Sequence, residues 1–267
     1  MTFSLLDLGA NLAHDSFDDD RDDMMQRAAD AGVRTMIVTG SSDDSNRRAA
    51  ELARAHPGVL YSTAGVHPHH ASDYTDASDA LIRELVNDDV VVAVGECGLD
   101  YFRNFSPREA QLDAFRRQLD IARDTGLPVF LHQRDAHDDF VEILEPMLPE
   151  LSRAVAHCFT GEGESLREYL AMGLYIGITG WICDERRGKH LHDIAHIIPD
   201  DRLLIETDAP YLLPRTIEPK PKTRRNEPMY LPEVLKVVAE ARCQSEENVA
   251  QITTEIARRF FNLPAGE

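Results

Sequence analysis

The sequence has few cysteines, no excess of basic residues and no long apolar run. Its four cysteines, Cys97, Cys158, Cys183 and Cys243, are spaced too irregularly for a zinc knuckle or a disulfide framework. We therefore expect reduced and mostly buried thiols. No apolar run approaches the length of a membrane span, and the start lacks the basic and apolar regions of a secretory signal. These absences argue against a membrane protein and favour a cytoplasmic location.

The charge balance excludes one way of handling nucleic acids. The chain of 267 residues carries 28 Lys and Arg against 47 Asp and Glu, a formal charge of −19. A protein that coats nucleic acid through bulk electrostatics needs a basic surface, so that class is disfavoured, although a local basic site is not. With 43% hydrophobic residues, the chain can bury a sizeable core and is expected to fold.

Short apolar runs alternate with amphipathic stretches along the whole chain, without a low-complexity linker. The strand candidates are residues 4–8, 35–39, 60–64, 90–94, 129–131, 154–156, 174–178 and 203–205. The helix candidates are residues 43–56, 80–86, 164–172, 232–242 and 246–261, and a helix following a capping box at 106–109. This pattern predicts βα units around a parallel sheet in a single domain, residues 1–267. The size fits a (β/α)₈ barrel, the fold class we expect, although an open doubly wound sheet gives similar local patterns.

Four polar residues stand at the carboxyl ends of predicted strands. They are Glu96, His132, His157 and Asp208. In a barrel these strand ends converge on one face, where the active sites of this fold are built, so the four side chains would meet. The alternative is that each is an ordinary strand-end residue that hydrogen-bonds to its neighbours.

The residue types define what such a site can do. Two imidazoles and two carboxylates suit divalent cations such as Mg²⁺, Mn²⁺ or Zn²⁺, and the lack of a thiolate argues against a closed structural zinc site. A metal with an open position activates water and polarises a phosphoryl or carbonyl oxygen, which favours hydrolysis. Glu96 could bridge two ions, and Asp208 could bind a metal or accept the proton of the attacking water.

Histidines and basic residues near other strand ends are candidate substrate contacts. His67 and His69 could touch a phosphate or assist the metal, unless this is simply a polar loop. A cationic set could ring the same face: Arg103, Arg134, Arg186, Arg187, Arg215, Lys220, Lys222, Arg224 and Arg225. The alternative is a solvated charged loop. Neighbouring aromatic residues, among them Trp181, could stack bases or pack on the rim. The Asp run at 18–23 is expected to cap a helix and supply its negative first turn.

Several motifs, in order, resemble those of TatD-type metal-dependent nucleases from about Asp7 to Phe261. They are Ala64-Gly65-Val66-His67-Pro68-His69, Gly95-Glu96-Cys97-Gly98-Leu99-Asp100-Tyr101, Leu131-His132-Gln133-Arg134, His157-Cys158-Phe159-Thr160-Gly161, Glu206-Thr207-Asp208-Ala209-Pro210-Tyr211-Leu212 and Arg225-Asn226-Glu227-Pro228. The resemblance implies a barrel of the metallo-dependent hydrolase type. Its expected activity is Mg²⁺-dependent removal of nucleoside monophosphates from the 3′ end of single-stranded DNA, and also RNA, in DNA repair or nucleic-acid turnover.

The same resemblance assigns roles to individual positions. Glu96, His132 and His157 would be metal ligands, and Asp208 a ligand or the catalytic base. His67 and Asn226 would lie near the phosphate. His69, Arg134 and Arg225 are further candidate substrate contacts on the strength of their placement and charge alone. We expect one or two ions, no membrane partner and, with slight preference, a monomer.

One segment departs from the wider family. Most members carry a His-x-His pair after the first strand, where this chain has Gly9-Ala10-Asn11, as does the branch it most resembles. A second metal would then rest on Glu96, Asp208, Asn11 and water, an oxygen-rich set that suits weakly held Mg²⁺ better than Zn²⁺. Two rival functions remain: a metal-dependent hydrolase of an ester or amide such as an aminoacyl-tRNA, and a non-catalytic strand-binding barrel.

Overall fold

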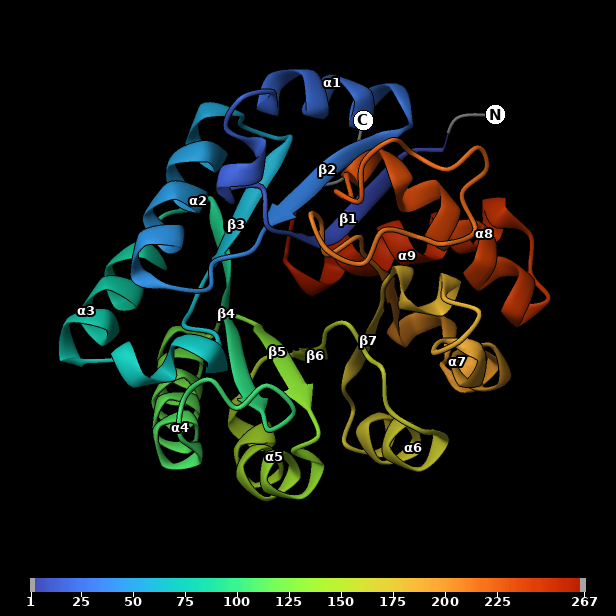
Figure 1. The fold of residues 1–267 in the computed structure, drawn as a ribbon. Helices are drawn as coiled ribbons and strands as arrows, with labels where there is room; N and C mark the ends of the chain where they lie inside the picture. The colour runs from blue at the N-terminus through green and yellow to red at the C-terminus, as the bar shows by residue number, and fades with distance from the viewer. Residues whose placement is uncertain (1–2, 265–267) are drawn as a thin grey trace. The chain divides into compact units, whose positions relative to one another are not determined.

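A computed structural model describes residues 3–264, in which β-strands and α-helices alternate along the chain (Figure 1). The strands are β1 (Leu5–Ala10), β2 (Val33–Val38), β3 (Leu60–Ala64), β4 (Val91–Asp100), β5 (Val129–Arg134), β6 (Ala154–Ala156), β7 (Tyr175–Ile178) and β8 (Leu203–Ile205). The helices are α1 (Arg21–Asp30), α2 (Asp43–Ala55), α3 (Asp76–Leu85), α4 (Arg108–Thr125), α5 (His137–Leu144), α6 (Gly163–Ala171), α7 (Lys189–Ile194), α8 (Leu231–Arg242) and α9 (Glu246–Phe260).

The strands form one sheet whose order, β1 to β8, is their order in the chain. The pairings β3–β4, β4–β5, β5–β6 and β7–β8 are all parallel. Parallel strands joined by helices are buried on both faces, which explains the continuous apolar runs of the sequence. Among residues 3–264, no helix is long and apolar enough to cross a bilayer.

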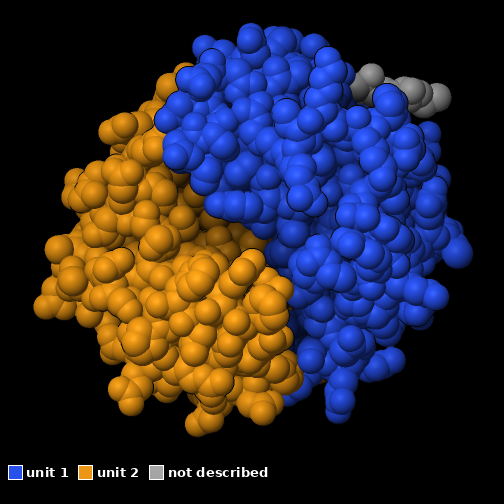
Figure 2. All heavy atoms as spheres, in the orientation of Figure 1, with its two compact units in different colours: residues 1–37, 158–170, 176–267 blue, residues 38–157, 171–175 orange. Residues whose placement is uncertain are grey.

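The chain divides into two compact units, coloured separately in Figure 2. One consists of residues 38–157 and 171–175, here called the histidine unit, and contains β3 to β6 with α2 to α5. Helices α2 and α4 pack on β3 and β4, and the rings of Phe115 and Phe140 stack at 5.5 Å between α4 and α5. The hydroxyls of Ser42 and Thr75 cap α2 and α3 through reciprocal capping boxes, which fix where these helices begin.

The other unit consists of residues 1–37, 158–170 and 176–267 and is here called the arginine unit. In it β7 pairs with β8, with Ile176 opposite Leu203. Helices α8 and α9 pack against each other, and α9 covers β1 and β8 with buried residues such as Phe260. Ser245 caps the first turn of α9 by accepting a hydrogen bond from Asn248 N.

At two predicted helix starts the expected side-chain capping bond is absent. Ser106 does not cap α4: its hydroxyl accepts from Ser72 N and donates to the His69 carbonyl, so it stabilises the turn after β3. Asp20 occupies the N-cap position of α1, as predicted, but its carboxylate makes no capping hydrogen bond, because the guanidinium groups of Arg27 and Arg225 bind it. The predicted negative first turn of α1 is present, at residues 22 and 23.

The cysteines are free thiols, in agreement with their irregular spacing. Cys97 and Cys183 are buried and Cys158 is half-buried, but Cys243 is exposed at the end of α8.

Candidate metal centre

A bulge in β4 places the carboxylate of Glu96. In the pairing of β4 with β5, Gly95 faces Phe130 and Cys97 faces Leu131, so Glu96 is an extra residue without an opposite partner. Such bulges re-aim a side chain and are frequent beside active sites. Beyond the bulge, Gly98 has a φ of 141°, and a Cβ there would lie 1.9 Å from the His132 carbonyl oxygen. Only glycine lets the two strands run together past His132.

One oxygen of Glu96 is approached by three imidazole rings from the ends of three other strands. Its Oε1 lies 2.7 Å from His157 Nε2, 3.0 Å from His132 Nδ1 and 3.4 Å from His67 Nε2. Glu96 and His157 are each 5% exposed, so water cannot satisfy these groups freely. Each ring nitrogen needs a proton or a cation in order to face a carboxylate oxygen favourably. A divalent cation meets this requirement for several rings at once, so the residues present fit a metal.

The protonation states of His67 and Glu96 agree with that role. Burial lowers the pKa of His67 to about 4 despite the nearby Glu96 charge, so this ring is neutral near pH 7. Burial would raise the pKa of Glu96, but the surrounding histidines outweigh it and hold the pKa well below its usual range. Neutral imidazole and ionised carboxylate are the forms that bind metal ions. At His132, burial would lower the pKa, but hydrogen bonds to Asp100 and Glu96 outweigh it and raise the pKa, so a metal would displace a proton from this ring. The candidate ligand atoms of His67, Glu96 and His132 all lie within 4.8 Å of one another.

Asp100 belongs to the same cluster and was missed in the sequence. Its Oδ2 lies 2.8 Å from His69 Nε2 and 3.3 Å from His132 Nε2, and its side chain is 1% exposed. A carboxylate on the second nitrogen of a ligand histidine fixes the tautomer and orientation of the ring. The sequence does contain a sign of this role. Asp100 follows Glu96 by four positions in the same segment, and a strand places residues at that spacing on one face.

Asp208 lies in the arginine unit with Asn11 and Asp7. Its Oδ1 accepts a hydrogen bond of 3.0 Å from Asn11 Nδ2, and its backbone is left-handed, with a φ of 54°. Its amide nitrogen donates to the Gly9 carbonyl, which ties the segment after β8 to the end of β1. Asp7 is fully buried and accepts from the backbone and hydroxyl of Thr207. Burial raises the pKa of Asp7 to about 7 against these hydrogen bonds.

Comparison with known proteins identifies the family. A family model described as TatD related DNase matches residues 6–262. The chain belongs to the TatD family. It is 50% identical over 261 residues to the "3'-5' ssDNA/RNA exonuclease TatD" of Erwinia billingiae, which covers 98% of this chain and 100% of that protein. The protein of the same name from Erwinia tasmaniensis is 51% identical over 259 residues, or 97% of this chain and 100% of that protein.

Solved structures agree with the family assignment. The crystal structure of the TatD homologue YJJV from Escherichia coli K12 is similar, with a TM-score of 0.89 and 30% identity, over 99% of this chain and 100% of that one. The predicted TIM barrel of the metallo-hydrolase type is therefore confirmed. Membership of this family of metallo-hydrolases implies a divalent metal, and the cluster of His67, Glu96 and His132 provides a place for it.

The remaining residues singled out by the TatD motifs have varied surroundings. His69 is partly exposed and packs edge-on against His67 at 4.2 Å, beside Asp100. Arg134, the last residue of β5, lies over the ring of Phe102 at 3.9 Å. Both side chains are partly exposed, His69 at 28% and Arg134 at an intermediate level, so both are candidates for substrate contact.

Arg225 and Asn226 are occupied by the protein itself. The Arg225 guanidinium donates to the Ser16 carbonyl, to both oxygens of Asp20 and to Glu227. Asn226 is fully buried, donates to the Thr207 carbonyl and accepts from Glu227 N. These contacts shape the segment that follows Asp208.

Proposed function

We propose that this protein is a metal-dependent 3′–5′ exonuclease that hydrolyses single-stranded DNA and RNA and releases nucleoside monophosphates. The observation that carries the proposal is the single Glu96 oxygen approached by three histidines, in a chain about half identical to proteins named for this activity. As a nuclease of the TatD family, the chain acts on phosphodiesters, and the strand polarity follows the names of these relatives.

The proposed ligands are Glu96, His132 and His157, with Asp208 as a further ligand or as the base. Magnesium is the expected ion, and one or two ions could be held, with Asn11 near a second position. When bound, a divalent ion polarises the scissile phosphoryl group and makes water a better nucleophile. Asp208 then accepts the proton of the attacking water at its carboxylate, and Asn11, 3.0 Å away, keeps that carboxylate oriented.

The terminal phosphate is held by hydrogen-bond donors. His67 and His69 lie together beside Glu96, and Arg134 stands at the end of β5, so we assign these three to the terminal phosphate. Arg225 and Asn226 position the loop after Asp208 through their contacts with Asp20, Thr207 and Glu227. The residues therefore divide into those that touch the phosphate and those that hold the loop in place.

The test is a product ladder from 5′-labelled and 3′-labelled single strands, with Mg²⁺ and with EDTA. We expect stepwise shortening from the 3′ end that EDTA abolishes, and loss of cleavage in Glu96→Ala and His157→Ala. His70→Ala is the matched control, because His70 is exposed beside the cluster. Full-rate digestion by either ligand variant would refute the metal centre. Strand binding without cleavage would favour a non-catalytic role, and turnover of aryl esters or aminoacyl-tRNA in its place would favour another hydrolase.

A further inference from the structure

A pocket lies in the arginine unit, outside the cluster around Glu96. It has a volume of about 430 Å³ and is formed by residues 180–187 after β7 and residues 212–224 after β8. The two segments touch directly: a Cβ on Gly180 would lie 2.2 Å from the Leu212 carbonyl oxygen. Both segments leave the carboxyl ends of their strands, and the second begins four residues after Asp208. The pocket therefore opens at the strand ends where this fold carries its chemistry.

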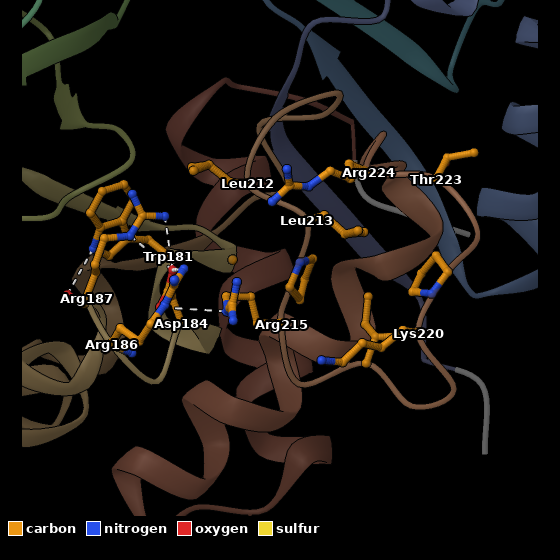
Figure 3. Close-up of a pocket in the computed structure, with 14 residues that line it drawn as sticks. Trp181, Asp184, Arg186, Arg187, Leu212, Leu213, Arg215, Lys220, Thr223 and Arg224 are labelled. Carbon is orange, nitrogen blue, oxygen red and sulfur yellow. Dashed lines mark hydrogen bonds and ion pairs between the residues drawn. The ribbon is translucent and has the colours of Figure 1, made fainter.

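The lining of this pocket is strongly cationic in an acidic protein. Five positive residues line it, namely Arg186, Arg187, Arg215, Lys220 and Arg224, against Asp184 as the one lining carboxylate (Figure 3). Lys220 and Arg224 are exposed and form no hydrogen bond or ion pair with any residue in the described range 3–264. Unpaired cations gathered in a concave site attract anions.

Asp184 organises the arginines and does not compete for a ligand. Its side chain is 4% exposed, and its oxygens accept from Arg186 N at 2.9 Å and Arg187 Nε at 3.0 Å. Burial raises the pKa of Asp184, but these hydrogen bonds outweigh it and lower the pKa to about 2. The carboxylate thus stays ionised and holds two guanidinium groups at the pocket while remaining out of reach itself.

An aromatic ring, that of Trp181, also lines the pocket. The Arg187 guanidinium lies 4.3 Å from the centre of the Trp181 ring, and Trp181 Nε1 donates to the Arg187 carbonyl. Leu212, Leu213 and Pro214 add apolar lining next to it. An aromatic ring beside cations is the combination by which proteins bind single strands without sequence preference, with bases stacked and phosphates paired.

We propose that this pocket binds an internal nucleotide of the single strand, on the 5′ side of the residue being removed. Lys220 and Arg224 contact its phosphates, and a base stacks at Trp181. Arg215 and Arg186 stay paired with Glu185 and Asp184 at the edge of the pocket. This proposal rests on the proposed exonuclease function. The pocket would bind the strand at an internal position, which a site for the terminal phosphate alone cannot do. The proposal predicts that binding affinity depends on strand length, because a strand too short to reach the pocket makes no contact with it.

The test uses Lys220→Ala/Arg224→Ala, because neither side chain has a partner to lose among residues 3–264. The matched control is Arg34→Ala/Lys236→Ala, which removes the same charge from two exposed positions outside the pocket. Binding of 5′-fluorescein (dT)₁₂ and (dT)₃ is measured by anisotropy in EDTA at several salt concentrations. We expect the pocket variant to bind (dT)₁₂ about tenfold more weakly, with a salt slope smaller by about 1.4 for two lost phosphate contacts. Its binding of (dT)₃ stays within twofold of wild type, as does the control variant throughout.

Two further arms separate nucleotide recognition from charge alone. Trp181→Ala should weaken (dT)₁₂ binding severalfold and Trp181→Phe should retain most of it, because phenylalanine still stacks. Poly-glutamate should compete poorly with (dT)₁₂. Equal losses in the pocket and control variants, wild-type affinity in the pocket variant, or equal competition by poly-glutamate would each overturn the proposal. If the wild type binds the strand but does not cleave it with Mg²⁺, the exonuclease function alone is refuted. If the wild type cleaves and the Lys220→Ala/Arg224→Ala variant binds (dT)₁₂ as tightly as wild type, the pocket alone is refuted.

Discussion

Replacing Asp100 with asparagine tests whether the buried carboxylate controls the metal-binding face of His132. Asp100 Oδ1 accepts a 2.7 Å hydrogen bond from Arg103 N, so the asparagine oxygen takes that place and its NH₂ group replaces Oδ2. The NH₂ group then faces the Nε2 atoms of His69 and His132, which must become acceptors. The proton of His132 moves to Nδ1, the atom 3.0 Å from Glu96, where a metal would need a lone pair.

The expected size of this effect is a 10- to 100-fold loss of metal affinity, typical of groups that orient ligand histidines. This corresponds to about 1.4 to 2.8 kcal/mol. The assay is exonuclease rate against Mg²⁺ or Mn²⁺ concentration. We expect the half-saturating concentration to rise by that factor and the rate to recover at saturating metal. Asp113→Asn, on the exposed face of α4, is the control for loss of a carboxylate. A metal dependence within twofold of wild type, in an Asp100→Asn protein with a normal urea midpoint, would refute the reasoning.

Three further perturbations have defined outcomes. Mn²⁺ at one hundred times its dissociation constant should stabilise the wild type by about 2.7 kcal/mol in urea unfolding, and Glu96→Ala should lose this gain; equal stabilisation of both would contradict the proposed ligands. The raised pKa of Asp7, about 7, means that the folded state holds a proton that the unfolded state releases above its ordinary value of 3.8, so stability falls as pH rises between these values. The free energy of unfolding of Asp7→Asn, measured in EDTA, should therefore increase relative to that of the wild type by up to about 4 kcal/mol between pH 4 and pH 8. A difference that does not change with pH would show that Asp7 is already ionised in the folded protein. Gly180→Ala should cost at least 1 kcal/mol in chemical denaturation, because its Cβ would collide with the Leu212 carbonyl 2.2 Å away, and a variant as stable as wild type would mean that the loop yields freely.

The apolar pattern predicts most of the fold because these strands are buried on both faces, and a buried strand is a run of apolar residues. Strands β3, β6 and β8 coincide with their apolar runs, since each run ends where its strand ends. Strands β4 and β5 continue beyond their runs to Asp100 and Arg134. There the buried positions are polar residues that satisfy one another, Glu96 with His132 for example, and a pattern of apolar residues cannot register such pairs.

The candidate site was predictable as a set of residues but not as a geometry. Polar residues after apolar runs marked Glu96, His132 and His157, and these three do meet. The bulge that re-aims Glu96 arises from the register between β4 and β5, which the sequence of either strand alone does not contain. The pattern does not single out Asp100, because Asp100 lies at the end of β4, well past the apolar run at 90–94, and not close behind it as Glu96 does.

The basic stretch after Asp208 shows why charge in a sequence does not reveal which charges are available. Arg225 is separated from Asp20 by 205 positions, yet its guanidinium binds that carboxylate and lowers its pKa to about 2. Its neighbour Arg224 and the nearby Lys220 have no such partner among residues 3–264. A substrate phosphate would have to displace Asp20 to reach Arg225 but would meet only water at Lys220 and Arg224. A cationic side chain that is already in an ion pair must break that pair to bind a phosphate, which weakens the binding by the free energy of the lost pair. The strand should therefore be held by the cations that folding leaves unpaired.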